Sequence, residues 1–156
     1  MFRLDSEAAL LAAFRPKDRD IVEVDRGTAF PLGVRHYFTW RQPAGTYVYV
    51  VFAVPGGVPT GIAFDTNEGG GASVPQMCDW CQTMGLGAQV SLLTAKLNGL
   101  KRVGVRVCTG LRCEQNLEEA AQRSGRSIVP AMEKLVARMG QFAAGSLKID
   151  LFRLGP

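Results

Sequence analysis

The stretch that decides the fold contains Cys78-Asp79-Trp80-Cys81 and, further along the chain, Cys108-Thr109-Gly110-Leu111-Arg112-Cys113. These two motifs hold all four cysteines of the 156-residue chain, with the spacings C-x2-C and C-x4-C. Two close cysteine pairs, separated by a segment long enough for a hairpin, are typical of a tetrahedral zinc site. Four thiolates complete the coordination of zinc and leave no position for a reactive water. We therefore expect a structural metal and not a catalytic one.

Three other chemistries use paired cysteines. Two disulfides would suit an exported protein, but the N-terminal residues Met1–Asp5 lead into a segment with acidic residues and no sustained apolar run. We therefore expect a cytoplasmic, reducing environment, in which paired cysteines are more often metal ligands than bridges. A thioredoxin-like role for Cys78 and Cys81 lacks a surrounding βαβ pattern. An iron–sulfur cluster also takes four thiolates, and the spacing alone does not separate it from zinc.

Length and composition indicate an ordinary globular domain. The chain has 47% hydrophobic and 21% charged residues, which argues against disorder, and it is long enough to bury a core. No apolar run approaches the length of a membrane span, so we expect a soluble protein with no membrane partner. The formal net charge is +4, and four thiolates around one zinc would bring it nearer to +2. This mildly basic balance is compatible with a nucleic-acid or ribosomal neighbourhood.

The first half of the chain predicts a helix followed by an antiparallel meander. Asp5–Phe14 is rich in Ala and Leu, and either Asp5 or Ser6 can cap it. Ile21–Val24 and Val34–Trp40 have the composition of extended segments. Tyr47–Val54 is an almost continuous β-branched and aromatic run, which predicts a central strand buried on both faces. Thr60–Phe64 then returns as the next strand.

The second half predicts a hairpin between the cysteine pairs. Val90–Leu97 and Lys101–Val107 are strand-like, and Asn98-Gly99 between them is a strong two-residue hairpin motif. Glu114–Arg123 predicts a helix that begins at the second cysteine pair, where the positive end of the helix dipole favours a thiolate at Cys113. A cysteine knuckle, a hairpin and a second pair at a helix start form the treble-clef arrangement.

These elements predict an α+β fold, with an antiparallel β-meander and flanking helices joined to a four-cysteine treble-clef zinc finger. We expect one domain in which residues 1–74 form the meander lobe and residues 75–156 form the zinc-finger lobe. Asn67–Ser73 would be a flexible loop between them, without the Lys-Ser or Lys-Thr of a phosphate-binding loop. A final helix from Pro130 carries an apolar stripe, and Leu147–Leu151 could add a strand or an interface.

The residues favour a binding module over an enzyme. His36 is the only histidine, and no nucleophile motif accompanies it. We therefore expect no catalytic residues and no small-molecule substrate. Trp80 lies between two ligands on a tight knuckle, where an exposed ring among basic residues would make a binding hot spot for a protein or RNA. The alternative is that Trp80 packs onto the hairpin and the basic side chains are a solvated face. The basic candidates are Lys96, Lys101, Arg102, Arg106 and Arg112.

Several motifs, in this order, resemble the FusB-like family of treble-clef zinc proteins, also described as FBP domains, which bind elongation factor G. The motifs are Phe14-Arg15-Pro16, Val58–Ala63, Met77-Cys78-x-x-Cys81, Ser91–Lys96, Val103-Gly104-x-x-Val107-Cys108 and Leu111–Glu114. The resemblance implies structural zinc on Cys78, Cys81, Cys108 and Cys113. It also implies a surface near the zinc finger that contacts the translocase and frees it from the ribosome when fusidic acid traps it.

The sequence departs from this family in two respects. The resistance proteins carry an additional N-terminal helical domain, which this chain is too short to contain, and family members often have an aromatic residue where this chain has Arg106. A housekeeping role in translation, with elongation factor G or a ribosome-associated protein as partner, is therefore favoured over drug resistance. The alternatives are an RNA-binding zinc protein that uses the basic hairpin on ribosomal RNA, and an enzyme with a cleft over the meander.

Overall fold

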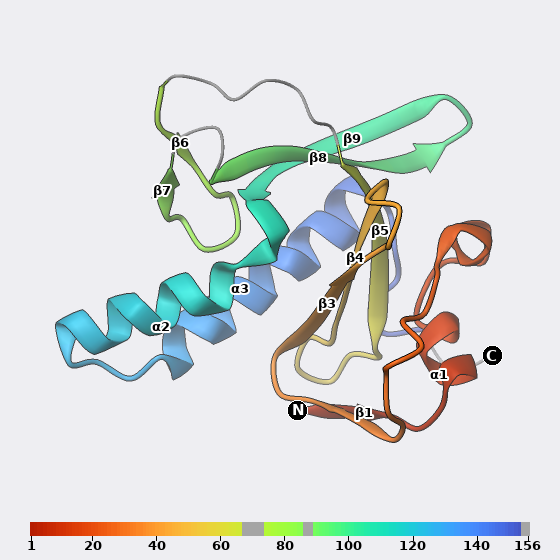
Figure 1. Ribbon diagram of the computed structural model, residues 1–156, viewed down its shortest axis with the longest axis horizontal. Helices are drawn as coiled ribbons and strands as arrows, with labels where there is room; N and C mark the ends of the chain where they lie inside the picture. Colours follow the sequence, from red (N-terminus) through yellow and green to blue (C-terminus); the bar gives the residue numbers. More distant parts are fainter. Residues whose placement is uncertain (67–73, 86–88, 154–156) are drawn as a thin grey trace.

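An antiparallel sheet with the strand order β3-β4-β5-β8-β9 runs through the protein (Figure 1). The structure is a computed structural model that describes residues 1–66, 74–85 and 89–153. The strands span Tyr37–Arg41, Tyr47–Phe52, Thr60–Thr66, Val90–Asn98 and Lys101–Cys108, respectively. β5 joins β8 through the pairs Asp65–Thr94 and Thr66–Leu93. The hairpin between the cysteine pairs thus belongs to the same sheet as the meander, and the sheet crosses the boundary expected near residue 74.

Strand β4 is the centre of the core, as its sequence predicts. Val48, Val50 and Phe52 pack into a cluster on one face of the sheet, while Tyr49 and Val51 pack into a second cluster on the other. All five side chains are buried. This arrangement confirms the prediction of a central strand covered on both sides, because successive side chains of a strand point to opposite faces.

One face of the meander is covered by the N-terminal elements. These are β1 (Phe2–Leu4), α1 (Glu7–Ala12), the 3-10 helix η1 (Pro16–Ile21) and β2 (Leu32–Val34), with β1 and β2 paired. The Ser6 hydroxyl accepts a hydrogen bond from the Ala9 N–H at 3.1 Å and caps α1, so the predicted helix forms in a shorter version. Phe14 lies over Gly61, where a Cβ atom would approach its ring to 2.7 Å. Glycine is therefore required at this crossing.

The opposite face is covered by the C-terminal helices, and Figure 1 shows α1 and α3 on different sides of the meander. α2 spans Cys113–Ser124 and ends at Gly125 in the left-handed conformation, with φ of 68°. α3 spans Val129–Gln141 and continues as the π-helix η3, Phe142–Ser146. The apolar stripe predicted for the last helix is buried against the sheet at Met132, Leu135, Val136 and Met139. The α+β class of the fold is thus confirmed.

Two segments with strand-like sequences do not form strands. Ile21–Val24 is not a strand, because Ile21 ends η1 and the segment is held by Tyr49, whose hydroxyl donates to the Ile21 carbonyl at 2.5 Å. For Leu147–Leu151, the sequence left a strand or an interface open, and the strand does not form. Its two leucines are buried, and the Leu151 carbonyl accepts the Val58 N–H at 2.9 Å. The predicted loop at Asn67–Ser73 lies outside the described residues. In the described part of the chain, no helix is long and apolar enough to cross a membrane.

Candidate metal centre

The four cysteine sulfurs converge on one point. Sγ of Cys78 lies 3.7 Å from Sγ of Cys113, and Sγ of Cys81 lies 3.4 Å from Sγ of Cys108. All four sulfurs fall within 4.8 Å of one another, and all four residues are buried. A disulfide requires about 2.05 Å between sulfurs. In a tetrahedral zinc site with bonds of about 2.3 Å the sulfurs lie about 3.8 Å apart, so the observed spacing fits the metal and not the bridge.

The first pair lies on a knuckle between two very short strands, β6 (Gln76–Met77) and β7 (Met84–Gly85). The Cys78 N–H donates to the Thr83 carbonyl at 2.9 Å, and the Gln82 N–H donates back to the Cys78 carbonyl at 2.9 Å. Gln82 has a φ of 63°, in the left-handed region, which closes the turn. Both sulfurs of the pair therefore face the same side of the knuckle.

The second pair connects the sheet to a helix. Cys108 ends β9 and Cys113 begins α2, with the 3-10 turn η2 (Thr109–Leu111) between them. Gly110 has a φ of 71°, a conformation that glycine adopts without a steric penalty. Among the described residues, no side chain caps α2 at Arg112. The helix begins at Cys113, as the sequence predicts, and the positive end of its dipole favours a thiolate at this position.

Hydrogen bonds reach the sulfurs from the surrounding residues and from one another. The Asn116 side-chain amide donates to Sγ of Cys108 at 3.2 Å, and the Cys81 N–H donates to Sγ of Cys78 at 3.4 Å. Hydrogen bonding, chiefly with the Cys108 thiol, lowers the pKa of Cys78 to about 7. The same kind of contact with Cys108 raises the pKa of Cys113. Four buried sulfurs cannot all ionise without a compensating cation, which is what a divalent metal supplies.

The residues around this centre carry a family signature. The model of a family described as the FBP C-terminal treble-clef zinc-finger matches residues 9–144. The chain belongs to this family. The match contains both cysteine pairs and the sheet and helices that position them. Together with the four buried sulfurs, it establishes structural zinc as the cofactor and decides between the zinc and iron–sulfur readings.

A solved structure, titled "Structure of the fusidic acid resistance protein FusC", is similar to this FBP-family chain. The two superpose with a TM-score of 0.53 at 17% identity, over 80% of this chain. The chain spans 57% of the length of that protein. At this identity the likeness shows a shared fold. A comparison with curated proteins gave no match.

Tyr37 braces the second knuckle from the meander. Its hydroxyl donates to the Leu111 carbonyl at 2.8 Å and accepts the Glu114 N–H at 3.0 Å. The hydroxyl thus holds the residues on both sides of Arg112 and Cys113. Burial raises the pKa of Tyr37, which keeps it protonated as a donor. Sequence reasoning missed this residue, because nothing local to β3 indicates a contact 74 positions away.

Trp80 is buried, so the prediction of an exposed ring is wrong. The side chain is 1% exposed, with ring centroids 5.9 Å from Phe64 and 6.2 Å from Phe142. The Arg138 guanidinium donates a hydrogen bond to the Trp80 main-chain carbonyl at 2.8 Å. The preceding residue, Asp79, donates its N–H to the Arg106 carbonyl at 2.7 Å, and its carboxylate accepts the Arg106 N–H at 3.0 Å. Asp79 therefore faces β9, and Trp80 is directed into the core.

The five basic candidates are exposed, but the structure does not gather all of them. Lys96 and Arg102 are opposite each other across the hairpin, and Arg106 is opposite Leu92, so these side chains share its outer face. Arg102 also forms an ion pair with Asp65 of β5. By the alternation of a strand, Lys101 points to the other face from Arg102.

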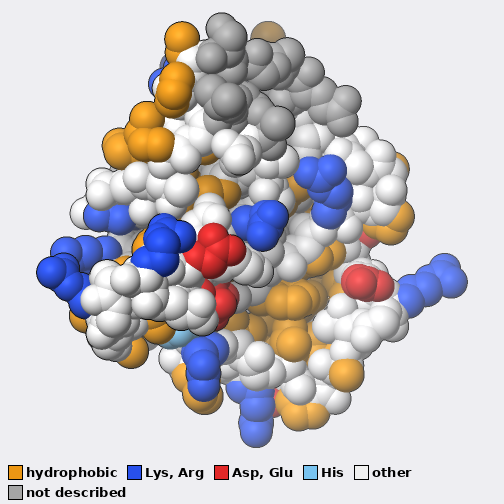
Figure 2. All heavy atoms as spheres, turned by 60° about the vertical axis from the view of Figure 1, so that its left-hand side comes forward, with side chains coloured by type: hydrophobic (Ala, Val, Ile, Leu, Met, Phe, Trp, Pro, Cys, Tyr) orange, Lys and Arg blue, Asp and Glu red, His pale blue; other side chains and the backbone are white. Residues whose placement is uncertain are grey.

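Arg112 lies apart from this face, at the start of α2 beside Cys108. From the side of β6, β7 and α2, Lys and Arg side chains are spread among acidic and uncharged ones (Figure 2). The basic residues that share one face of the hairpin are thus Lys96, Arg102 and Arg106, of which Arg106 is nearest to Cys108 along β9. We name the outer face of the β8–β9 hairpin, with these three residues and Leu92, the hairpin face.

Proposed function

We propose that this chain is a non-enzymatic, cytoplasmic zinc-binding protein that binds elongation factor G, or another ribosome-associated protein, in translation. The observation that carries the proposal is the family match over residues 9–144, which includes the complete zinc finger. The zinc ligands are Cys78, Cys81, Cys108 and Cys113. Zinc has a structural role here, because four thiolates leave no coordination position for a substrate.

The partner surface that we propose is the hairpin face. With Trp80 in the core, the exposed apolar group nearest to the basic residues along β8 is Leu92, which is 43% exposed and lies opposite Arg106. An apolar side chain among exposed arginine and lysine residues suits an acidic protein surface with an apolar centre. The hairpin runs directly into Cys108, so zinc binding fixes its orientation. Lys101 and Arg112 would lie at the periphery of such a contact.

A pull-down of the zinc-loaded protein against purified elongation factor G tests the proposal. We expect binding that Arg106→Glu and Lys96→Glu weaken at least tenfold, because each reversal places an acid on the hairpin face. Arg123→Glu is the matched control, since Arg123 is exposed near the far end of α2 and should leave binding unchanged. Absence of binding by the folded, zinc-loaded protein would refute elongation factor G as the partner.

RNA binding is the second candidate, supported by the positive charges of Lys96 and Arg106 on one face. It predicts a different response to salt. Binding to a ribosomal RNA fragment would fall steeply as salt rises from about 50 to 200 mM, because each neutralised phosphate releases counterions. A protein contact centred on Leu92 would be less sensitive. Leu92→Ala should weaken protein binding and leave RNA binding nearly unchanged, which separates the two functions.

A further inference from the structure

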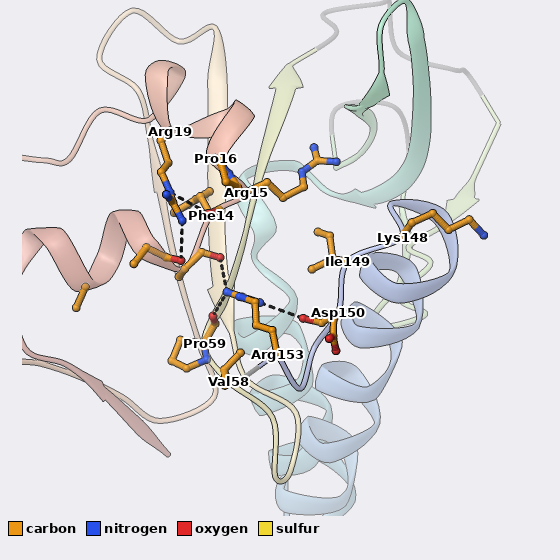
Figure 3. A pocket seen from close by; sticks show the side chains of 13 residues that line it. Phe14, Arg15, Pro16, Arg19, Val58, Pro59, Lys148, Ile149, Asp150 and Arg153 are labelled. Carbon is orange, nitrogen blue, oxygen red and sulfur yellow. Dashed lines mark hydrogen bonds between the residues drawn. The ribbon is translucent and has the colours of Figure 1, made fainter. Parts of the chain in front are cut away.

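A second concave site lies away from the metal centre, between the C-terminal end of α1 and the segment that follows η3 (Figure 3). Its volume is about 630 Å³, within the range of roughly 300–1,000 Å³ that is usual for small-molecule sites. Most of its wall is apolar, with Ala9, Ala12, Phe14, Pro59 and Ile149 among the lining residues. We name this cavity the α1 pocket.

Two arginines in the wall of the α1 pocket are held in place by main-chain carbonyls. Arg19 Nε donates to the carbonyls of Leu11 and Phe14, each at 3.2 Å. Arg153 Nη2 donates to the carbonyls of Ala13 and Pro59, at 3.0 and 2.8 Å. Both guanidinium groups therefore converge on the end of α1, where the helix dipole favours cations.

These contacts leave donors unused. Within the described part of the chain, neither Nη1 of Arg19 nor Nε of Arg153 has a hydrogen-bond partner. Burial lowers the pKa of Arg153, and the nearby charge of Arg19 adds to this effect while Asp150 opposes it. An anion between the two arginines would stabilise the charged form of Arg153.

Two of the other charged groups of the pocket, Arg15 and Asp150, have contacts of their own. Arg15 is bound to Asp18 at 2.7 Å and to the Lys96 carbonyl at 2.6 Å, and its Nη1 has no partner among the described residues but is buried. The Lys148 side chain points away from the cavity (Figure 3). The Asp150 carboxylate accepts the Phe152 N–H at 2.9 Å. Among the described residues, Arg19 and Arg153 thus supply the unpartnered guanidinium nitrogens of the pocket that are not buried.

We propose that the α1 pocket binds a small amphipathic anion: one carboxylate or sulfonate on an apolar body. The acid group would lie on Arg19 and Arg153, and the body would cover Ala12, Pro59 and Ile149. Two free donor nitrogens match the two oxygens of one carboxylate. A polyphosphate would need more donors and a polar wall. This site is independent of the function proposed for the zinc finger.

The probe that tests the site is 8-anilinonaphthalene-1-sulfonate, and its neutral counterpart is N-phenyl-1-naphthylamine, which has the same rings without the sulfonate. On the zinc-loaded protein we expect one saturable fluorescent site, with the anion bound at least tenfold more tightly than the neutral dye. Decanoate should displace the dye, and decanol should displace it far less well. Equal affinities for the two dyes would overturn the proposal.

Variants locate the site. Ala12→Trp should fill the pocket and abolish dye binding, while Ala120→Trp, at an exposed position on α2, should leave it unchanged. Arg19→Gln should reduce the preference for the anion and spare the neutral dye. Melting temperature and zinc content are measured for each variant, and Ile149→Trp replaces Ala12→Trp if the latter does not fold. Unchanged dye binding in a folded pocket-filling variant would place the dye elsewhere and refute the α1 pocket.

Discussion

Replacing Tyr37 by phenylalanine tests how the meander supports the metal centre. The substitution removes one hydroxyl and keeps the ring in β3. It leaves the Leu111 carbonyl and the Glu114 N–H without the partner that now lies 2.8 and 3.0 Å away. These two groups lie on either side of Cys113 in the sequence. The substitution therefore removes two hydrogen bonds that support a zinc ligand and leaves the four sulfurs unchanged.

The expected cost is about 1–3 kcal/mol in the free energy of unfolding, the range for leaving part-buried polar groups unsatisfied. Urea denaturation of the zinc-loaded protein measures this cost. Transfer of zinc to a chromogenic chelator measures the second effect, and we expect transfer to be faster in the variant. The reason is that η2 and the first turn of α2 lose the contact that fixes them to β3.

Tyr47→Phe is the matched control, because the Tyr47 hydroxyl has no hydrogen-bond partner among the described residues. It should change the free energy of unfolding by less than about 0.5 kcal/mol. If Tyr37→Phe behaves like this control in both assays, the bracing role assigned to the hydroxyl is wrong.

The pH dependence of the same variant gives a further check. Since burial raises the pKa of Tyr37 above its ordinary value of 10.0, the folded state retains the proton more strongly than the unfolded state. Its contribution to stability is complete below pH 10 and declines as the pH rises above that value. The difference in stability between the wild type and Tyr37→Phe should therefore shrink in alkaline urea titrations. A difference that grows with pH would contradict this sign.

Three other substitutions test the metal centre and the core. Cys108→Ser should lower the zinc content and the melting temperature together, since structural zinc contributes roughly 10–16 kcal/mol in finger peptides; unchanged values of both would exclude the metal assignment. Trp80→Ala should lower the free energy of unfolding, measured in urea, by about 3–5 kcal/mol, as expected for a large buried side chain. A decrease of less than about 1 kcal/mol would mean that the ring is not in the core. Gly61→Ala should cost about 1–3 kcal/mol, because its Cβ would approach the Phe14 ring to 2.7 Å; equal stability of this variant and the wild type would show that the ring can move aside.

Predictions from the sequence succeeded where short-range pattern determines structure. The hairpin between the cysteine pairs forms, although its turn is displaced by one residue: Asn98 pairs with Lys101, and Gly99 and Leu100 lie between them in place of the predicted Asn98-Gly99. The β-branched run predicted β4, and the cysteine spacing predicted the convergence of the sulfurs. The predictions failed where contacts between residues that are distant in sequence determine the structure. The ring of Trp80 is buried because Phe64 and Phe142 line its site, and neither is close to it in sequence. The α1 pocket joins segments from both ends of the chain, so no single stretch indicates it.

The contact between Asp79 and Arg106 has a consequence for the metal-free protein. β9 is the outermost strand of its sheet, and Asp79 occupies both main-chain hydrogen-bonding groups of Arg106 on the open side. Unpaired groups along such an edge recruit strands from other molecules. Because zinc holds the first knuckle in place, its removal should free this edge. We expect loss of the metal to promote self-association of the chain, so that zinc protects it from aggregation as well as from unfolding.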